Sequence, residues 1–242
     1  MSDFRNRSDR KELLDDYQGT IEELAIVLKD INRVNRLLGG YSITLNAVLR
    51  LIQEYPKKSY TILDIGCAEG NMLRELAKTA KKRNIKLHLI GVDLNSDALT
   101  LARSSSANFP EITYHAKDIL SADFSDFGCD IVITTLTMHH FKNPEILNFI
   151  QKFTRLSTIG VVINDLQRSV IAYYLFKVFS LIFIKTKVAR IDGLISIRRA
   201  FQKSELWELA NSLPNVDHEI AWKWAFRYVW ILRKKQQSSS YE

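Results

Sequence analysis

From residue 60 onward, hydrophobic runs of β type alternate with segments whose apolar positions recur every three to four residues. The first pattern is typical of strands and the second of amphipathic helices. Strands are predicted over residues 60–65, 86–93, 112–117, 130–136 and 159–165, and helices from Asn71, Ser96 and Pro144. This alternation implies βαβ units with right-handed crossovers, and therefore an α/β fold built on a parallel sheet.

Two β-rich runs close the pattern, in the stretch DHEIAWKWAFRYVWILRK, and predict a final antiparallel pair. Residues 1–55 precede the first strand and show helical spacing with a break at Gly39-Gly40. They are predicted to form an N-terminal helical cap outside the α/β core. The end of the chain, residues 237–242, is polar and rich in serine, and is predicted to be disordered.

Residues 169–184, SVIAYYLFKVFSLIFI, are apolar apart from two serines and Lys177. A membrane-spanning helix needs about 20 apolar residues, so this stretch is a poor candidate for one. Two interpretations remain: a buried helix, or a cap that gives a hydrophobic substrate an apolar wall. The expected organisation is a cap over 1–55, followed by a core over 56–236 with a cap insertion at about 167–200.

The sequence LDIGCAEGN, residues 63–71, joins the first predicted strand to a helix through a glycine loop. A triphosphate-binding loop needs Lys followed by Ser or Thr after its last glycine, whereas Gly70 is followed by Asn71. The dinucleotide fingerprint needs three glycines, but its three positions hold Gly66, Ala68 and Asn71. The loop therefore fits neither of these nucleotides.

Three acidic residues close predicted strands: Asp64, Asp93 and Asp118. They suit S-adenosylmethionine, a ligand with an ammonium, a carboxylate, a sulfonium and a ribose but no phosphate. Asp64 can face the ammonium, Asp93 can accept hydrogen bonds from both ribose hydroxyls, and Asp118 suits the adenine amino group. The glycine loop lets backbone N–H groups at the helix N-terminus approach the carboxylate of the ligand.

At these residues the chain resembles the class I S-adenosylmethionine-dependent methyltransferases. Their first motif reads acidic-x-Gly-x-Gly-x-Gly, and Ala68 replaces the middle glycine here, a difference of one methyl group. The resemblance implies a Rossmann-like, doubly wound sheet of seven mostly parallel strands, with the last strand reversed and S-adenosylmethionine as cofactor. The predicted cofactor-binding residues are Asp64, Gly66, Cys67, Ala68, Gly70, Asn71, Asp93, Leu94, Asp118, Ile119 and Thr135.

Methyl transfer is an in-line displacement that requires alignment and, for a hydroxyl acceptor, removal of a proton. His139 and His140 follow the fourth predicted strand and are candidate bases, with His140 favoured. The alternative is a histidine pair that serves packing or cofactor positioning. Further on, Arg168, Arg198 and Arg199 are candidates to hold a phenolate or carboxylate, or are simply surface and helix-end arginines.

The region after the fourth strand disfavours several acceptor classes. Enzymes that methylate exocyclic amines of bases carry an Asn/Asp-Pro-Pro-aromatic loop there, which TTLTMHHF does not resemble. C5-pyrimidine enzymes need a cysteine nucleophile, and neither Cys67 nor Cys129 is placed for that role. Metal-dependent catechol enzymes use an Asp after strand four and an Asp-Asn pair after strand five, and Asn164-Asp165 matches only the second half. No metal is therefore predicted.

Four further stretches extend the resemblance along the chain: ELLDD, INRVNRLLGGY, NDLQRSVIAYYLF and DGLISIRRAF. They are similar to bacterial small-molecule methyltransferases associated with type III polyketide and pigment biosynthesis. The resemblance implies O-methylation of a hydroxylated aromatic or pyrone, often with an alkyl chain. The alternatives are C-methylation of a quinone precursor and a non-catalytic binding protein of the same fold, which the intact strand-end carboxylates disfavour.

The chain has 242 residues and a formal net charge of +7, with 46% hydrophobic and 25% charged residues. This composition is that of an ordinary globular protein, and the length fits one α/β domain with an extra cap. Its basic clusters are solvated helix ends and loops, or alternatively a surface that attracts a membrane or an acidic carrier protein. Nucleic acid is not expected. A charged N-terminus and two cysteines without metal spacing point to the cytoplasm.

Overall fold

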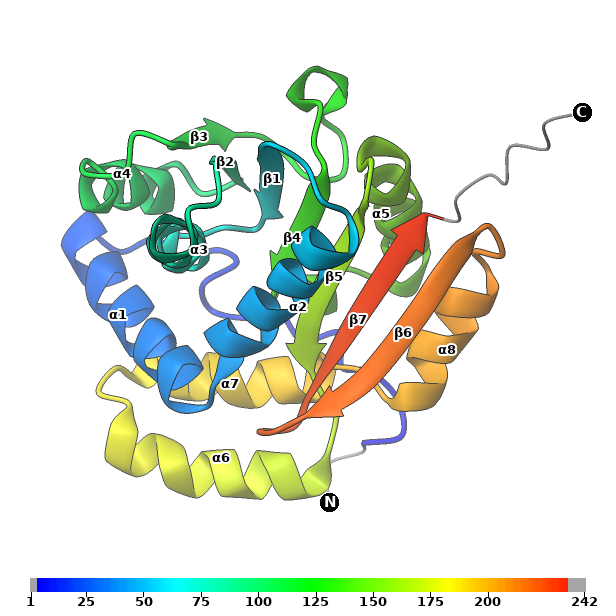
Figure 1. The fold of residues 1–242 in the computed structure, drawn as a ribbon. Helices are drawn as coiled ribbons and strands as arrows, with labels where there is room; N and C mark the ends of the chain where they lie inside the picture. The colour runs from blue at the N-terminus through cyan, green and yellow to red at the C-terminus, as the bar shows by residue number, and fades with distance from the viewer. Residues whose placement is uncertain (1–3, 235–242) are drawn as a thin grey trace, which may run out of the picture.

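Seven strands form one sheet in the order β3-β2-β1-β4-β5-β7-β6 (Figure 1). The parallel strands are β1 (Tyr60–Ile65), β2 (Leu87–Asp93), β3 (Ile112–Ala116), β4 (Ile131–Thr135) and β5 (Gly160–Leu166). β7 (Arg227–Lys234) runs antiparallel to both β5 and β6 (Val216–Lys223). The predicted doubly wound, seven-stranded sheet with a reversed last strand is confirmed.

This computed structural model describes residues 4–234. The tail predicted to be disordered, residues 237–242, lies outside the described residues. Each parallel strand begins or ends within one residue of its predicted bounds, because the β-branched runs that predict the strands also fill the core.

Helices cover both faces of the sheet. One face carries α2 (Gly40–Glu54), α3 (Asn71–Arg83) and α4 (Ser96–Ser105), which share a hydrophobic cluster with the buried side chains of β1 and β2. The other face carries α5 (Asn143–Leu156) and α8 (Lys203–Asn211), packed over the opposite side chains of β4 and β5. Successive side chains of a strand point to opposite faces, so each central strand contributes to both clusters.

The N-terminal region is only partly helical. α1 (Ile21–Leu37) begins at a capping box between Thr20 and Glu23, and Gly39 takes a left-handed conformation, with φ of 70°, between α1 and α2. Residues 4–19 contain no helix, so the prediction of a helical cap is wrong for this part. The N–H groups of Leu13 and Leu14 donate instead to the Asp192 carboxylate, 2.7 and 3.0 Å away.

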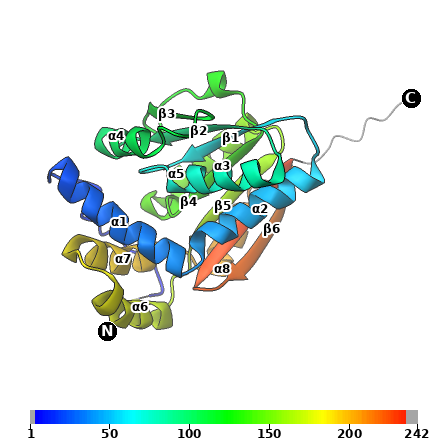
Figure 2. The same ribbon diagram turned by 60° about the vertical axis from the view of Figure 1, so that its left-hand side comes forward.

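The apolar stretch forms α6 (Val170–Phe183), which packs against α7 (Lys187–Arg199) beyond the ends of β4 and β5 (Figures 1 and 2). Its interpretation as a buried helix is wrong. Only one side of α6 contacts the rest of the protein, and Ile171, Val178 and Ile182 are each more than half exposed. None of the described helices is long and apolar enough to cross a membrane.

Asp30 joins α1 to the connection between α6 and α7. This residue is 5% exposed, and its Oδ2 accepts hydrogen bonds from Lys185 N, Thr186 N and Thr186 Oγ1 at 2.7–2.9 Å. Figure 2 shows α1 running alongside α7, so these bonds connect the two cap elements that lie over the same edge of the sheet.

We expect Asp30→Ala to loosen this junction without unfolding the sheet. Three donors lose their acceptor, at a cost of about 1–3 kcal/mol, and amide hydrogen exchange at residues 184–190 should accelerate by roughly tenfold to a hundredfold. Exchange in β1 and β4 should not change. The matched control is Glu22→Ala, an exposed change on the same helix. Equal exchange in both variants contradicts this assignment.

Candidate functional site

A cavity of about 900 Å³ lies beyond the carboxyl ends of the parallel strands. Ligand pockets typically span roughly 300–1,000 Å³, so this one has room for a cofactor and an acceptor together. Apolar side chains of α1, α6 and α7 line the side that faces away from the sheet. The predicted site residues that line it are Asp64, Gly66, Cys67, Ala68, Asn71, Asp93, Leu94, Ile119, Thr135, His139 and His140.

The loop after β1 depends on its glycines. Gly66 and Gly70 have φ of 73° and 74°, in the left-handed region. A Cβ on Gly66 would lie 2.3 Å from Thr137 Oγ1, and one on Gly70 would lie 2.0 Å from the Tyr114 hydroxyl. Ala68 is also left-handed, with φ of 45°, so the position of the missing motif glycine still has a conformation that glycine prefers. The turn can thus present its backbone closely to a ligand.

Two of the three strand-end carboxylates meet at this loop. Asp93 accepts hydrogen bonds from Ala68 N at 2.7 Å and Asn95 N at 2.9 Å, which fixes the loop to the end of β2. Asp64 is 2% exposed, and burial together with the charge of Asp93 raises the pKa of Asp64 to about 8. A cation in the cavity would be needed to keep Asp64 ionised at neutral pH.

Asp118 is not part of this arrangement. β3 ends at Ala116, and Asp118 is exposed and does not line the cavity. Its carboxylate accepts hydrogen bonds from Leu120 N and Ser121 Oγ within its own loop. The prediction of an adenine contact at Asp118 is therefore not supported by its position, whereas the neighbouring Ile119 does line the cavity. Gly70 shapes the loop without lining the cavity.

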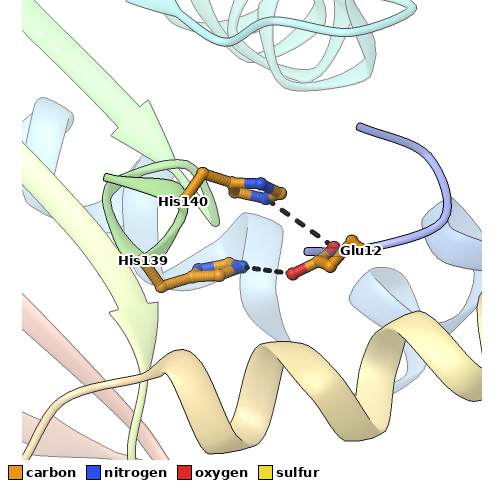
Figure 3. Close-up of side chains that lie close together, drawn as sticks. All are labelled: Glu12, His139 and His140. Atoms are coloured by element: carbon orange, nitrogen blue, oxygen red, sulfur yellow. Dashed lines mark ion pairs between the residues drawn. The ribbon is translucent and has the colours of Figure 1, made fainter. Parts of the chain in front are cut away.

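The histidine pair lies in a 3₁₀ turn, η2 (Met138–His140), directly after β4. Figure 3 shows both rings facing Glu12, which comes from the N-terminal segment. His139 Nε2 lies 3.2 Å from Glu12 Oε1 and His140 Nε2 lies 3.7 Å from Glu12 Oε2. The Nδ1 atoms contact two other carboxylates, Asp165 at 2.7 Å and Asp15 at 2.9 Å. Each ring is thus held between two carboxylates.

Burial lowers the pKa of His139, but the charge and hydrogen bond of Asp165, together with Glu12, outweigh this effect and raise the pKa to about 9. For Glu12, burial raises the pKa, but the hydrogen bond and charge of the histidines lower it below its usual range. His139 is therefore a cationic bridge at neutral pH, with no free nitrogen to accept a proton. His140 is 29% exposed and is the histidine that an acceptor can reach.

Arg168 makes structural contacts and does not hold a phenolate or carboxylate acceptor as predicted. Its side chain is fully buried, does not line the cavity, and forms an ion pair with Glu205 at 2.7 Å. It also donates to the carbonyl oxygens of Phe4, Arg5 and Ala200. All its nitrogens are engaged in fixing the N-terminal segment, so it cannot hold an anionic acceptor without losing these bonds.

Arg199 and Arg198 also lie outside the cavity lining. Arg199 donates to the carbonyl oxygens of His139 and His140, and Arg7 donates to His139 O at 2.9 Å from the other side. These two guanidinium groups hold the backbone of the histidine turn. The prediction that Arg168, Arg198 and Arg199 form an acceptor-binding group is corrected accordingly, and Arg199 is a positioning residue.

Three residues of the site were not predicted. Glu12 and Asp15 belong to the stretch ELLDD, which matched the resemblance but carried no assigned role. Arg227, at the start of β7, lines the cavity and is 2% exposed, and its Nε and Nη1 have no hydrogen-bond partner among the described residues. Burial lowers the pKa of Arg227 to about 10. No local pattern distinguishes this arginine from the others in the sequence.

The glycine loop, the strand-end carboxylates and the sheet order agree with a family comparison. Residues 62–160, less than half of the chain, match the family model described as "Methyltransferase domain". The matched segment extends from β1 to the start of β5, and therefore contains the loop, both inward-facing carboxylates and the histidine turn.

Curated relatives match about half of the chain. An uncharacterized methyltransferase of Mycobacterium tuberculosis is 28% identical over 109 residues, which are 45% of this chain and 48% of that protein. The carboxy-S-adenosyl-L-methionine synthase of Nautilia profundicola is 29% identical over 122 residues, 50% of this chain and 49% of that protein. The chain thus spans about half the length of the curated relatives it matches.

Solved structures match most of the chain, beyond the segment that the family model covers. The plantazolicin methyltransferase BpumL, in complex with a monoazolic desmethylPZN analog and SAH, has a TM-score of 0.66 at 16% identity, covering 92% of this chain and 93% of that one. The magnesium protoporphyrin IX methyltransferase ChlM of Synechocystis PCC 6803, with bound SAH, has a TM-score of 0.58 at 14% identity, covering 86% and 87%. At these identities the likeness shows the fold alone, and the predicted Rossmann-like, doubly wound fold is confirmed.

Proposed function

We propose that this protein is an S-adenosylmethionine-dependent methyltransferase that methylates a small acceptor. The observation that carries the proposal is a single cavity lined by the glycine loop and its carboxylates at one side, and by the histidine–glutamate cluster and apolar cap at the other. A cofactor on the loop then faces the place where an acceptor can be activated. A non-catalytic role is disfavoured because the glycine loop and both carboxylates, Asp64 and Asp93, line this cavity.

The cofactor half of the cavity matches the chemistry of S-adenosylmethionine. The ligand's carboxylate faces the N-terminus of α3 at Asn71, where the helix dipole favours an anion. Its ammonium meets Asp64, and its ribose hydroxyls donate to Asp93. Leu94 and Ile119 supply an apolar surface for the adenine ring. Two of the structural neighbours above hold SAH, the demethylated cofactor, which supports this assignment.

The side chains that line the acceptor half of the cavity are suited to bind an apolar molecule with an ionisable oxygen. Phe176 and Phe179 of α6 and Leu28 of α1 contribute apolar walls, so a hydroxylated aromatic or pyrone with an alkyl chain is the acceptor class proposed. Its oxygen attacks the methyl carbon while the C–S bond breaks and the electron pair stays on sulfur. The hydroxyl proton passes to the His140 side of the cavity. C-methylation of a quinone precursor is the alternative, and the position of the transferred methyl decides between them.

Arg227 supports the same acceptor class. No described residue forms an ion pair with it, and unpaired buried guanidinium nitrogens that line a cavity are suited to a ligand anion. A phenolate or a carboxylate on the acceptor would satisfy them. This residue takes the role that the sequence suggested for Arg168, Arg198 and Arg199.

Binding of S-adenosylmethionine should depend on the ionisation of Asp64. Its pKa of about 8 means that the free protein holds a proton there at pH 6–7, and an ammonium ligand must displace it. Affinity should therefore rise with pH, by up to about tenfold per unit below pH 7.5, with proton release detected by calorimetry in buffers of different ionisation enthalpy.

In Asp64→Asn the pH dependence should disappear, and affinity at pH 7.5 should fall by at least about 1.5 kcal/mol. The matched control is Asp118→Asn, which changes an exposed carboxylate outside the cavity and should bind as the unchanged protein does. Affinity that is independent of pH in the unchanged protein would remove Asp64 from the ammonium site.

His140→Ala should lower turnover of an alkylresorcinol or alkylpyrone by about 10²–10⁴, the usual cost of losing proton transfer, with cofactor affinity unchanged. Product mass and the methyl position are measured by mass spectrometry and NMR. His139→Ala, measured in parallel, removes the buried bridge to Asp165 and should also lower thermal stability. Near-full turnover in both variants would exclude the histidine turn from the chemistry.

Replacing Arg227 with Met should raise KM for the acceptor by about tenfold or more, because a charge-assisted hydrogen bond is lost. The free energy of unfolding should stay the same or rise, since no ion pair is broken and a buried charge is removed. Arg233→Met is the control on the same strand; it breaks surface ion pairs with Glu54 and Glu219 and should leave KM unchanged. An unchanged KM in Arg227→Met contradicts the assignment.

A further inference from the structure

Glu12, His139 and His140 form a compact group of metal-ligating side chains at the acceptor end of the cavity (Figure 3). One ligand atom from each lies within 4.8 Å of the other two. The glutamate oxygens are 3.2 and 3.7 Å from the two Nε2 atoms. Two ligands of one ion, each about 2.1 Å from it, stand roughly 3.0–3.4 Å apart. The glutamate–histidine pairs are therefore close to the spacing that a single ion requires.

Each histidine has a carboxylate on its other ring nitrogen. Asp165 holds His139 Nδ1 at 2.7 Å, and Asp15 holds His140 Nδ1 at 2.9 Å. A carboxylate at Nδ1 keeps a proton on that nitrogen, so an ion that displaces the second proton of His139 would meet an Nε2 lone pair directed toward Glu12. Protein metal sites use this carboxylate–histidine pairing to orient their ligands. Two such pairs that converge on one point are not needed for packing.

The atoms that face this point are incompletely satisfied by the protein. His139 is 2% exposed, and its Nε2 has no hydrogen-bond partner among the described residues despite its closeness to Glu12. Glu12 is 7% exposed and is oriented by Ser196 Oγ, which donates to its Oε1 at 2.7 Å. A buried carboxylate and a buried nitrogen aimed at the same space favour a cation between them.

We propose that Glu12, His139 and His140 bind a divalent transition-metal ion of the Zn²⁺ type. Imidazole and carboxylate ligands suit Zn²⁺ and Fe²⁺, and a set of two histidines and one carboxylate leaves coordination positions open. His140 is 29% exposed, so the open side is the cavity side. The sequence predicted no metal because the pattern of the metal-dependent catechol enzymes is incomplete, and Glu12, far from the histidines along the chain, was not considered as a ligand.

The ion gives the proposed acceptor site a means of activation. With the ion bound, His140 would be a ligand and not the proton acceptor. A hydroxyl at an open position would then lose its proton to solvent more readily, because the ion stabilises the oxyanion that remains. The oxyanion then forms the O–C bond as the C–S bond of the sulfonium breaks. This role rests on the proposed function, whereas the existence of the ion site does not.

The test measures the ion directly, on metal-free full-length protein without cofactor or acceptor. Titration with Zn²⁺ by calorimetry and with Co²⁺ by visible absorption should give one ion per chain. Glu12→Gln and His140→Ala should each weaken binding by more than about 100-fold, and Asp165→Asn, which alters a residue that orients a ligand, by about 10–100-fold. Glu69→Gln changes another carboxylate of the same cavity and should bind the ion unchanged.

Circular dichroism checks that each variant is folded, and anomalous diffraction at the zinc edge from the unchanged protein locates the ion independently of any variant. Binding that is not stoichiometric, or an ion located elsewhere, overturns the metal site. So does an ion affinity of the folded Glu12→Gln and His140→Ala variants that equals that of the unchanged protein. Methyl transfer is assayed separately, so that its failure and the failure of the metal site are distinguishable.

Discussion

The hydrogen bond between the buried side chains of His139 and Asp165 joins the turn after β4 to the end of β5, the two strands at the centre of the cavity floor. Asp165 also accepts from the backbone N–H of His139, so one carboxylate fixes both the ring and the turn. Since β4 and β5 are parallel, their carboxyl ends lie at the same edge, and the orientation of the turn decides what faces the cavity. Arg7 and Arg199 hold the carbonyl oxygens of the same turn.

The N-terminal segment completes this arrangement. Glu12 and Asp15 reach the histidines because the segment crosses the strand ends, where Asp192 of α7 accepts hydrogen bonds from two of its backbone N–H groups. Arg168 donates to carbonyl oxygens of the same segment and forms an ion pair with Glu205. The acidic half of the cluster is thus supplied by residues that precede the segment matched by the methyltransferase family model, residues 62–160. A fragment limited to that segment would retain the glycine loop and lose the carboxylate that faces both rings.

The cap helix α6 and the central strands have similar apolar sequences but differ in how far they are buried. The central strands β1, β4 and β5 are buried on both faces, so their sequences are nearly continuous apolar runs. α6 is also apolar almost all round, yet it covers the cavity with Phe176 and Phe179 and leaves Ile171 and Ile182 exposed. Composition alone gives the same pattern for a buried helix and for a helix that walls a cavity on one side. The difference lies in how many neighbouring elements pack against it.

Local sequence determined the sheet and the cofactor loop. Strand and helix periods, and the glycines that a left-handed turn requires, act over a few residues, so Asp64, Gly66 and Asp93 could be placed from the letters alone. The prediction that Asp118 contacts the adenine is not supported, because its carboxylate accepts hydrogen bonds from its own loop. The position of a residue after a predicted strand does not reveal such local hydrogen bonds. The roles of Arg168 and Arg199, and the meeting of Glu12 with the histidines, depend on contacts between segments far apart in the chain. Only tertiary packing determines which buried charged groups are paired. It leaves Nε and Nη1 of Arg227, a residue that lines the cavity, without a hydrogen-bond partner within residues 4–234.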